Sequence, residues 1–299
     1  MKLAFSILLI SCLGYLGLSG QDSISVDKKR LKAIIITESV LSAGTMGILS
    51  TQWYSKEDRR SFHTFNDNKQ WLQMDKIGHV FSAYQTGRIG IDVLKWANVD
   101  DKKAAIYGGS LGILFLSGVE VLDGFSKDWG FSWGDFGANT FGAGLAISQE
   151  LLFEKQIAII KMSYHPTDFR EYRPNVLGES EQAGILKDYN GQTYWLSLNL
   201  KDITQADYMP DWLSISGGYS GTGMFVGSEN PMANSNGVSI PNVNRYRQYY
   251  ISLDIDLERI PTKSKFLKTT LKALNFIKVP LPTVRFQDGA SPKFYPFYF

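Results

Sequence analysis

Residues 129–143 of this chain read WGFSWGDFGANTFGA and combine aromatic side chains and glycines with one carboxylate, Asp135, and one amide, Asn139. A spacing of four residues places these two polar groups on the same face of a helix. Ser132 stands before them at a typical helix N-cap position, so the segment predicts a turn followed by a helix over residues 133–153. The polar pair then points from that helix toward a neighbouring element.

Two earlier segments carry the same pattern of a polar pair within an apolar stretch. Glu120 and Asp123 are three residues apart, and Asp75 and His79 are four apart. Each pair falls on one face of a helix. Because ionisable groups are costly inside apolar helices unless they are paired or hydrated, we expect the three segments to share one polar site. Asp75 by itself also suits the N-cap of its helix, where a carboxylate is favoured by the helix dipole.

Four apolar segments rich in small residues occur between residues 28 and 155, at residues 33–50, 75–96, 104–122 and 133–153. The third segment contains four glycines, and each would weaken an isolated helix by roughly 1 kcal/mol relative to alanine. Glycines of this kind suit a helix whose backbone lies against another helix. We therefore expect an N-terminal bundle of four or so small-residue-rich helices over residues 28–155.

The pattern changes to a period of two after residue 192, which is typical of half-buried strands. The clearest example lies between residues 249 and 257, where tyrosine, isoleucine and leucine alternate with serine and aspartate. Residues 264–277 instead predict an amphipathic helix. Strands are expected at residues 193–200, 212–219, 249–257, 279–286 and 293–299, and residues 156–163 are either a further strand or the tail of a helix. The predicted fold class is α+β, with a β-rich region over residues 156–299 that forms a partial antiparallel sheet or a small barrel.

Residues 1–20 have the short basic start, apolar core and small-residue end of a secretory signal peptide. The alternative is a lipobox at residues 9–12, in which Cys12 becomes the lipidated first residue. Cys12 is the only cysteine of the chain, so no disulfide and no thiolate metal site is expected after it. Both interpretations predict an exported protein of the cell envelope.

Composition and the end of the chain point to a membrane rather than to nucleic acid. The formal net charge of +2 gives no electrostatic case for nucleic-acid binding. Aromatic residues make up 13% of the chain, which fits a membrane boundary as well as an aromatic core. The chain ends FYPFYF, which resembles the C-terminal signal of outer-membrane barrels; a last strand of a periplasmic sheet is the alternative. Membrane lipid is the expected partner, with an envelope protein as a further one.

The candidate site consists of five residues from the polar segments, His79, Glu120, Asp123, Asp135 and Asn139. A histidine beside carboxylates can transfer protons in catalysis, and the same groups can bind a divalent cation such as Zn²⁺ or Mn²⁺. They can equally form a structural network with nearby lysines and arginines. The sequence has no P-loop, dinucleotide fingerprint, G-x-S-x-G elbow or Cys/His pair, so the commonest enzyme classes are excluded and no cofactor is expected.

The same residues resemble the YfiM-like family, a domain of unknown function described as a predicted periplasmic lipoprotein, in its long Bacteroidetes-type version. The resemblance covers about a quarter of the chain and rests on three motifs in the family's order, Asp75-Lys76-x-x-His79, Glu120-x-x-Asp123 and Gly130-x-Ser132-x-x-Asp135. A looser likeness connects Asp135, Asn139 and Gly142 to VanZ-like membrane proteins. The family resemblance implies an envelope location and no known activity.

These observations predict an exported envelope protein, at the outer membrane or on the periplasmic face of a membrane. We expect it to be membrane-associated and structural or assembly-related rather than an enzyme. The alternative is an envelope enzyme that acts on lipid or a cell-wall precursor through the His/Asp/Glu cluster, with His79 as the base.

Overall fold

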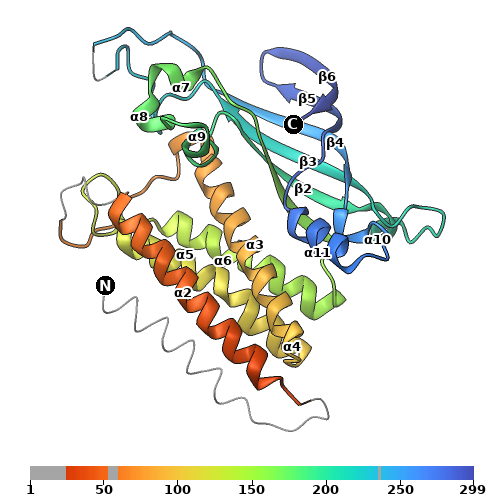
Figure 1. The fold of residues 1–299 in the computed structure, drawn as a ribbon. Helices are drawn as coiled ribbons and strands as arrows, with labels where there is room; N and C mark the ends of the chain where they lie inside the picture. Colours follow the sequence, from red (N-terminus) through yellow and green to blue (C-terminus); the bar gives the residue numbers. More distant parts are fainter. Residues whose placement is uncertain (1–24, 53–59, 235–236) are drawn as a thin grey trace. The chain divides into compact units, whose positions relative to one another are not determined.

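The computed structural model describes residues 25–52, 60–234 and 237–299 (Figure 1). The expected signal peptide and the alternative lipobox at Cys12 lie outside these residues.

The fold class is α+β, as the sequence predicts, and the chain forms two compact units. Unit 1 comprises residues 1–67 and 82–155, and its described elements are helices. Unit 2 comprises residues 68–81 and 156–299, and it contains a six-stranded antiparallel sheet. Helix α3 (Met74–Trp96) begins in unit 2 and continues into unit 1.

The long helices described in unit 1 are α2 (Lys28–Gln52), the later part of α3, α5 (Gly109–Asp123) and α6 (Trp133–Phe153). They lie side by side in Figure 1. A short helix, α4 (Asp101–Lys103), and a π-helical turn, η2 (Ala104–Gly108), lead directly into α5. The expected N-terminal helical bundle is therefore present.

Glycines allow the backbone of α3 to touch the backbones of η2 and α5. A Cβ atom added to Gly108 would lie 2.4 Å from the carbonyl carbon of Gly90, and one added to Gly112 would lie 2.1 Å from the carbonyl oxygen of Ala83. No larger side chain fits these positions without separating the two helices. The expectation that the glycines of residues 104–122 face another helix is confirmed.

Side-chain caps define where two of the helices begin. The Asp27 carboxylate accepts hydrogen bonds from the backbone N–H groups of Lys29 and Arg30, in the first turn of α2. The Ser132 hydroxyl accepts one from the backbone N–H of Asp135, with a distance of 3.1 Å. Helix α6 therefore begins directly after Ser132 and has the predicted bounds.

The start of α3 differs from the prediction. Residues Trp71, Leu72 and Gln73 have φ angles of 50°, 51° and 64° and form a left-handed 3₁₀ turn, η1 (Gln70–Gln73), before the helix. Helix α3 begins at Met74, so Asp75 lies inside its first turn. The prediction that Asp75 is an N-cap is wrong, because the N-cap residue lies before the first helical residue.

The sheet of unit 2 is an antiparallel meander in which each strand pairs with the next one along the chain. Its strands are β1 (Ala158–Tyr164), β2 (Gln192–Asn199), β3 (Leu213–Thr222), β4 (Tyr246–Ile255), β5 (Leu281–Gln287) and β6 (Ala290–Tyr298). The edge strands β1 and β6 do not pair with each other. Of the two expected forms, the structure has the partial sheet and not the closed barrel.

Short helices and a bridging segment connect these strands. The helices are α7 (Phe169–Tyr172), α8 (Pro174–Leu177), α9 (Glu181–Lys187), α10 (Leu200–Thr204), the 3₁₀ turn η3 (Leu257–Arg259) and α11 (Lys265–Leu274). After α11 the chain runs along the outer edge of β1. Met162 donates its N–H to Phe276 and accepts from the N–H of Lys278, each at 2.9 Å. This segment satisfies part of the otherwise open edge.

The sheet buries its polar face and exposes part of its apolar face. In β4 the buried residues are Gln248, Tyr250, Ser252 and Asp254, whereas Tyr249, Ile251 and Leu253 are each about half exposed. The period of two is as predicted. The usual arrangement of a soluble sheet, with apolar residues inside, is reversed in this strand.

Hydrogen bonds and ion pairs stabilise the polar interior of the sheet. The Asp254 carboxylate lies 2.9 Å from the Lys161 ammonium and 3.7 Å from that of Lys278, and all three side chains are fully buried. Ser197 donates its hydroxyl to Asp254 at 2.6 Å. Lys278 also donates to the backbone carbonyls of Leu253 and Val279. We call Lys161, Asp254 and Lys278 the interior triad.

The segment of residues 68–81 covers part of the apolar face of the sheet. Met74 packs in a buried cluster with Tyr194 of β2 and Met224, which follows β3. The Tyr219 hydroxyl donates a hydrogen bond to the carbonyl of Leu72. These contacts are the reason why residues 68–81 belong to unit 2 although they precede the last helices of unit 1.

Candidate functional site

The first polar pair, Asp75 and His79, lies on one face of α3, as its spacing predicts. The Asp75 Oδ1 atom is 3.9 Å from His79 Nε2 and accepts a hydrogen bond from the Tyr189 hydroxyl at 2.7 Å. The Lys76 ammonium lies 3.4 Å from the other oxygen of Asp75. His79 is partly exposed, so its imidazole lies near a carboxylate and remains accessible to solvent.

The other candidate residues, Glu120, Asp123, Asp135 and Asn139, lie in unit 1. Glu120, Asp135 and Asn139 are buried, and two of them meet at the start of α6. The Glu120 Oε2 atom accepts the backbone N–H of Ser132 at 3.2 Å, and the Ser132 hydroxyl caps Asp135. This cap joins the ends of α5 and α6.

The turn between α5 and α6 follows directly after Asp123, the fourth residue of this group. Asp123 is the last residue of α5, and its backbone carbonyl accepts the N–H of Ser126 at 2.9 Å. His63 contacts the same turn, with its Nδ1 atom 3.1 Å from the carbonyl oxygen of Gly124. Asp123 and His63 therefore both make hydrogen bonds to this turn.

Asp67 is a member of this network that the sequence did not single out. Its Oδ1 atom accepts a hydrogen bond from the Ser132 hydroxyl at 2.7 Å. Asp67 stands in the segment NDN at residues 66–68, which has no periodicity. Its role follows from its hydrogen bond to Ser132, which is far from Asp67 in the sequence. No local sequence pattern therefore indicates it.

The two groups of candidate residues have different chemical capacities. Asp75 and His79 supply a carboxylate and an imidazole, which suit proton transfer or two positions of a metal site. A structural zinc site has about four ligands, so this pair needs further donors to hold a metal. Glu120 and Ser132 make the hydrogen bonds that a structural network requires. The meeting of His79 with the four residues of unit 1 stays a prediction.

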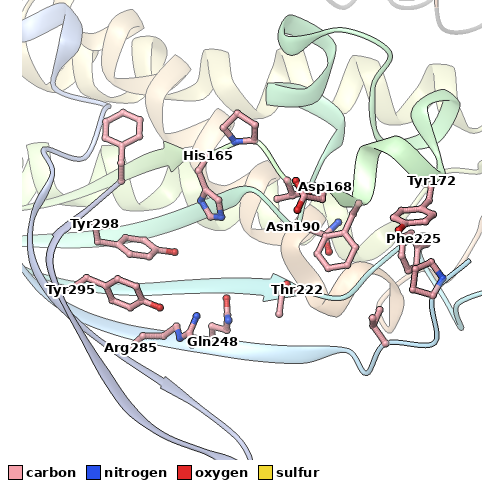
Figure 2. A pocket seen from close by; sticks show the side chains of 16 residues that line it. His165, Asp168, Tyr172, Asn190, Thr222, Phe225, Gln248, Arg285, Tyr295 and Tyr298 are labelled. Atoms are coloured by element: carbon pink, nitrogen blue, oxygen red, sulfur yellow. The ribbon is translucent and has the colours of Figure 1, made fainter.

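A second candidate site is a cavity of about 570 Å³ in unit 2. It has the size of a small-molecule site. Its polar lining comes from the loops and strand ends on one side of the sheet, with the residues His165, Asp168, Asn190, Thr222, Gln248, Arg285, Tyr295 and Tyr298. Figure 2 shows these side chains arranged around one open space. No motif in the sequence predicts this cavity.

Hydrogen bonds fix the floor of the cavity. The Tyr298 hydroxyl donates to that of Tyr250 at 2.8 Å, and Tyr250 donates to the side-chain oxygen of Gln248 at 3.0 Å. Burial raises the pKa of the Tyr298 hydroxyl. Burial also lowers the pKa of His165, and the nearby Asp188 carboxylate opposes this effect. At neutral pH the tyrosine is protonated and the imidazole is mostly neutral, so Arg285 carries the positive charge of the cavity.

Comparison with known proteins identifies a family for the N-terminal part. Residues 63–150 match the model of a family described as predicted periplasmic lipoprotein (DUF2279). All five candidate residues, from His79 to Asn139, lie in this range, and the resemblance expected from the three motifs is confirmed. No curated protein and no solved structure matches the chain. The chain is therefore an exported protein of the cell envelope, and its unit 2 lies largely outside the family match.

Proposed function

We propose that this envelope protein is a membrane-associated structural or assembly component whose helical unit 1 packs its apolar outer surface against lipid. The observation that carries the proposal is the distribution of side chains on α6. Trp133, Phe141 and Leu152 are 68%, 64% and 72% exposed. Soluble domains rarely expose large apolar side chains repeatedly along one helix, because each costs free energy in water.

The opposite face of α6 strengthens this argument. Asp135, Asn139 and Gln149 are at most 5% exposed, and they alternate at helical spacing with the apolar outer residues. Polar groups inside a helical unit and apolar groups outside it are the arrangement that a bilayer favours. The arrangement extends to α2, where Val40 and Leu41 are also largely exposed.

Helix length gives a second line of support. Among the described residues, one helical stretch, Asp101–Asp123, is long and apolar enough to cross a membrane by length and composition. Only 28% of its most apolar part is buried within the structure, whereas the core helix of a soluble protein is mostly buried. A helix of 23 residues also exceeds the roughly 20 residues that a bilayer core requires.

The experiment is membrane fractionation of cells that produce the full chain, followed by an alkaline carbonate wash. We expect the protein to remain in the washed membrane pellet. Recovery of all the protein in the soluble periplasmic fraction contradicts the proposal. A double variant, Phe141→Lys with Leu152→Lys, places two charges on the outer face of α6 and is expected to lower the pellet fraction. Glu179→Lys, at an exposed polar position of unit 2, is the matched control and is expected to leave it unchanged.

The second candidate function is an envelope enzyme that acts on lipid or a cell-wall precursor. The pairing of Asp75 with a partly exposed His79 favours it, because a carboxylate can orient an imidazole that serves as a base. In a deletion strain with an envelope phenotype, His79→Ala and Asp135→Ala are then expected to abolish complementation at normal protein levels. If both variants merely lower the amount of folded protein, the residues are structural.

A further inference from the structure

Two cations stand directly opposite each other beside the cavity of unit 2. Arg285 of β5 pairs with Lys293 of β6 in the antiparallel register. Their charged groups lie 5.6 Å and 5.0 Å from the centre of the Tyr295 ring. Like charges at directly opposed positions destabilise a pair of strands. Both cations therefore lie beside Tyr295, which lines the cavity.

The described carboxylates do not neutralise these two charges through direct ion pairs. Within the described ranges, neither Arg285 nor Lys293 forms an ion pair with a carboxylate. Among the side chains that line the cavity, the carboxylate is Asp168, which lies at the end away from Arg285 in Figure 2. The charged side chain at the end of the cavity near Arg285 is therefore a cation, and an anion bound there would relieve the repulsion between Arg285 and Lys293.

The other end of the cavity is aromatic. Phe225 is fully buried and packs edge-on against Phe169 and Tyr172, with ring centres 5.2 Å and 5.7 Å away. Figure 2 shows Phe225 and Tyr172 at one end of the open space and Arg285 with Tyr298 at the other. Asp168 lies on the aromatic side, where its negative charge disfavours an anion. The cavity therefore has an aromatic end and an end with the cation Arg285.

We propose that this cavity binds a small amphiphilic anion. Its phosphate or carboxylate group pairs with Arg285 and Lys293, and its apolar body contacts the aromatic end around Phe225. Arginine is suited to this task because its planar guanidinium forms two parallel hydrogen bonds with one oxyanion. A volume of about 570 Å³ accommodates a single ring or a short acyl group together with the head group.

The test uses phenyl phosphate, a water-soluble compound with one phosphate and one apolar ring. Binding to the full chain in phosphatidylcholine nanodiscs is measured by isothermal titration calorimetry. We expect phenyl phosphate to bind more tightly than inorganic phosphate, and phenol to show no binding. Equal affinities for phenyl phosphate and inorganic phosphate contradict the amphiphilic part of the proposal. Absence of phenyl phosphate binding to the folded protein overturns it.

Variants show whether the cations are responsible. Arg285→Gln is expected to weaken phenyl phosphate binding by roughly tenfold or more, which is typical of losing a charged hydrogen-bond partner. Lys293→Gln, at an exposed position where the fold tolerates change, is expected to weaken it several-fold. Lys268→Gln on the exposed surface of α11 is the matched control and is expected to bind like the wild type. Wild-type affinity in both Arg285→Gln and Lys293→Gln overturns the proposal.

The same chemistry occurs in lipid head groups and in soluble metabolites, and a competition experiment distinguishes them. Nanodiscs that contain phosphatidic acid are compared with nanodiscs of phosphatidylcholine alone. A lower apparent affinity for phenyl phosphate in the first case identifies a lipid head group as the source. Equal affinities in the two bilayers identify a soluble amphiphilic anion. Both results require the binding that Arg285→Gln weakens.

Discussion

The Asp254 carboxylate of β4 pairs with the Lys161 ammonium of β1 at 2.9 Å, and both side chains are fully buried. Strands β1 and β4 are not neighbours in the sheet, so the pair connects two strands across its polar interior. Charges in such a place are stable only when each is paired and hydrogen-bonded. Asp254 supplies the negative charge for Lys161 and for Lys278.

Replacing Asp254 is therefore expected to destabilise unit 2 strongly. In Asp254→Asn the side chain keeps its volume, but the two buried ammonium groups of the interior triad lose their counter-charge. Breaking a buried ion pair costs about 3–5 kcal/mol. The loss is measured as a decrease in the free energy of unfolding, or in the Tm, of the purified full chain.

The control for Asp254→Asn is a pair of similar geometry on the surface. Lys201 and Asp211 lie 2.6 Å apart, and the Asp211 side chain is well exposed. Because water already solvates both charges, Asp211→Asn is expected to change the Tm little. Equal effects of the two substitutions would show that the interior triad does not stabilise the sheet.

A second prediction concerns the pH dependence of stability. Burial lowers the pKa of Lys278 from 10.5 to about 8. Above pH 8 the folded protein loses this proton while the unfolded chain keeps it, so the unfolded state binds more protons. The free energy of unfolding is then expected to rise between pH 8 and pH 10. Denaturation curves collected across this range measure the slope.

The matched variant for this effect is Lys278→Met, which keeps the length of the side chain and removes the titrating group. Asp254 retains Lys161 as its partner in this variant. The rise in stability above pH 8 is expected to disappear. A rise of unchanged size in Lys278→Met would assign the effect to another group. Tyr194 and Tyr250 act in the opposite direction at higher pH, because burial raises the pKa of each hydroxyl.

Local signals explain why much of the fold could be predicted from the sequence. Helix α6 follows from one cap at Ser132 and a continuous apolar and small-residue pattern, and both of its ends were predicted. The strands follow from a period of two, which needs no knowledge of distant residues. The start of α3 was not predictable in this way, since the left-handed turn at Trp71 depends on contacts with unit 2, such as its N–H bond to Gly227.

The period of two could not show which face of β4 is buried. That choice depends on Lys161 and Lys278, which are far from β4 in the sequence and bring their charges to Asp254. The cavity is similar, because Arg285 and Phe225 belong to no common motif and meet only in the folded sheet. The candidate cluster was recognised by its spacing, and Asp67 was missed because its contact with Ser132 joins segments that are far apart in the sequence.

A third prediction tests the close contact of α3 and α5. Gly112→Leu places a side chain where a Cβ would already lie 2.1 Å from the Ala83 carbonyl oxygen. The helices must separate, so we expect loss of the folded protein or a large decrease in Tm. Gly144→Ala on α6 is the control, because nothing lies within 4 Å of its Cβ position.

The two glycine variants are expected to differ in sign. Alanine is favoured over glycine inside a helix by roughly 1 kcal/mol, so Gly144→Ala should keep or slightly raise the Tm. Circular dichroism of the purified proteins measures both changes. A well-folded Gly112→Leu protein with the wild-type Tm would contradict the close packing of α3 and α5.

The last prediction concerns Ser132, which joins three segments of unit 1. Its hydroxyl caps α6 at Asp135 and donates to Asp67, while its backbone N–H donates to Glu120. Ser132→Ala removes both hydroxyl bonds and is expected to cost about 2 kcal/mol, at the upper end of the range for N-caps. Its control is Ser264→Ala, because Ser264 caps the exposed helix α11 and makes no second hydroxyl bond within the described residues. We expect a clearly smaller loss there, and equal losses in thermal unfolding would show that the bond to Asp67 adds no stability.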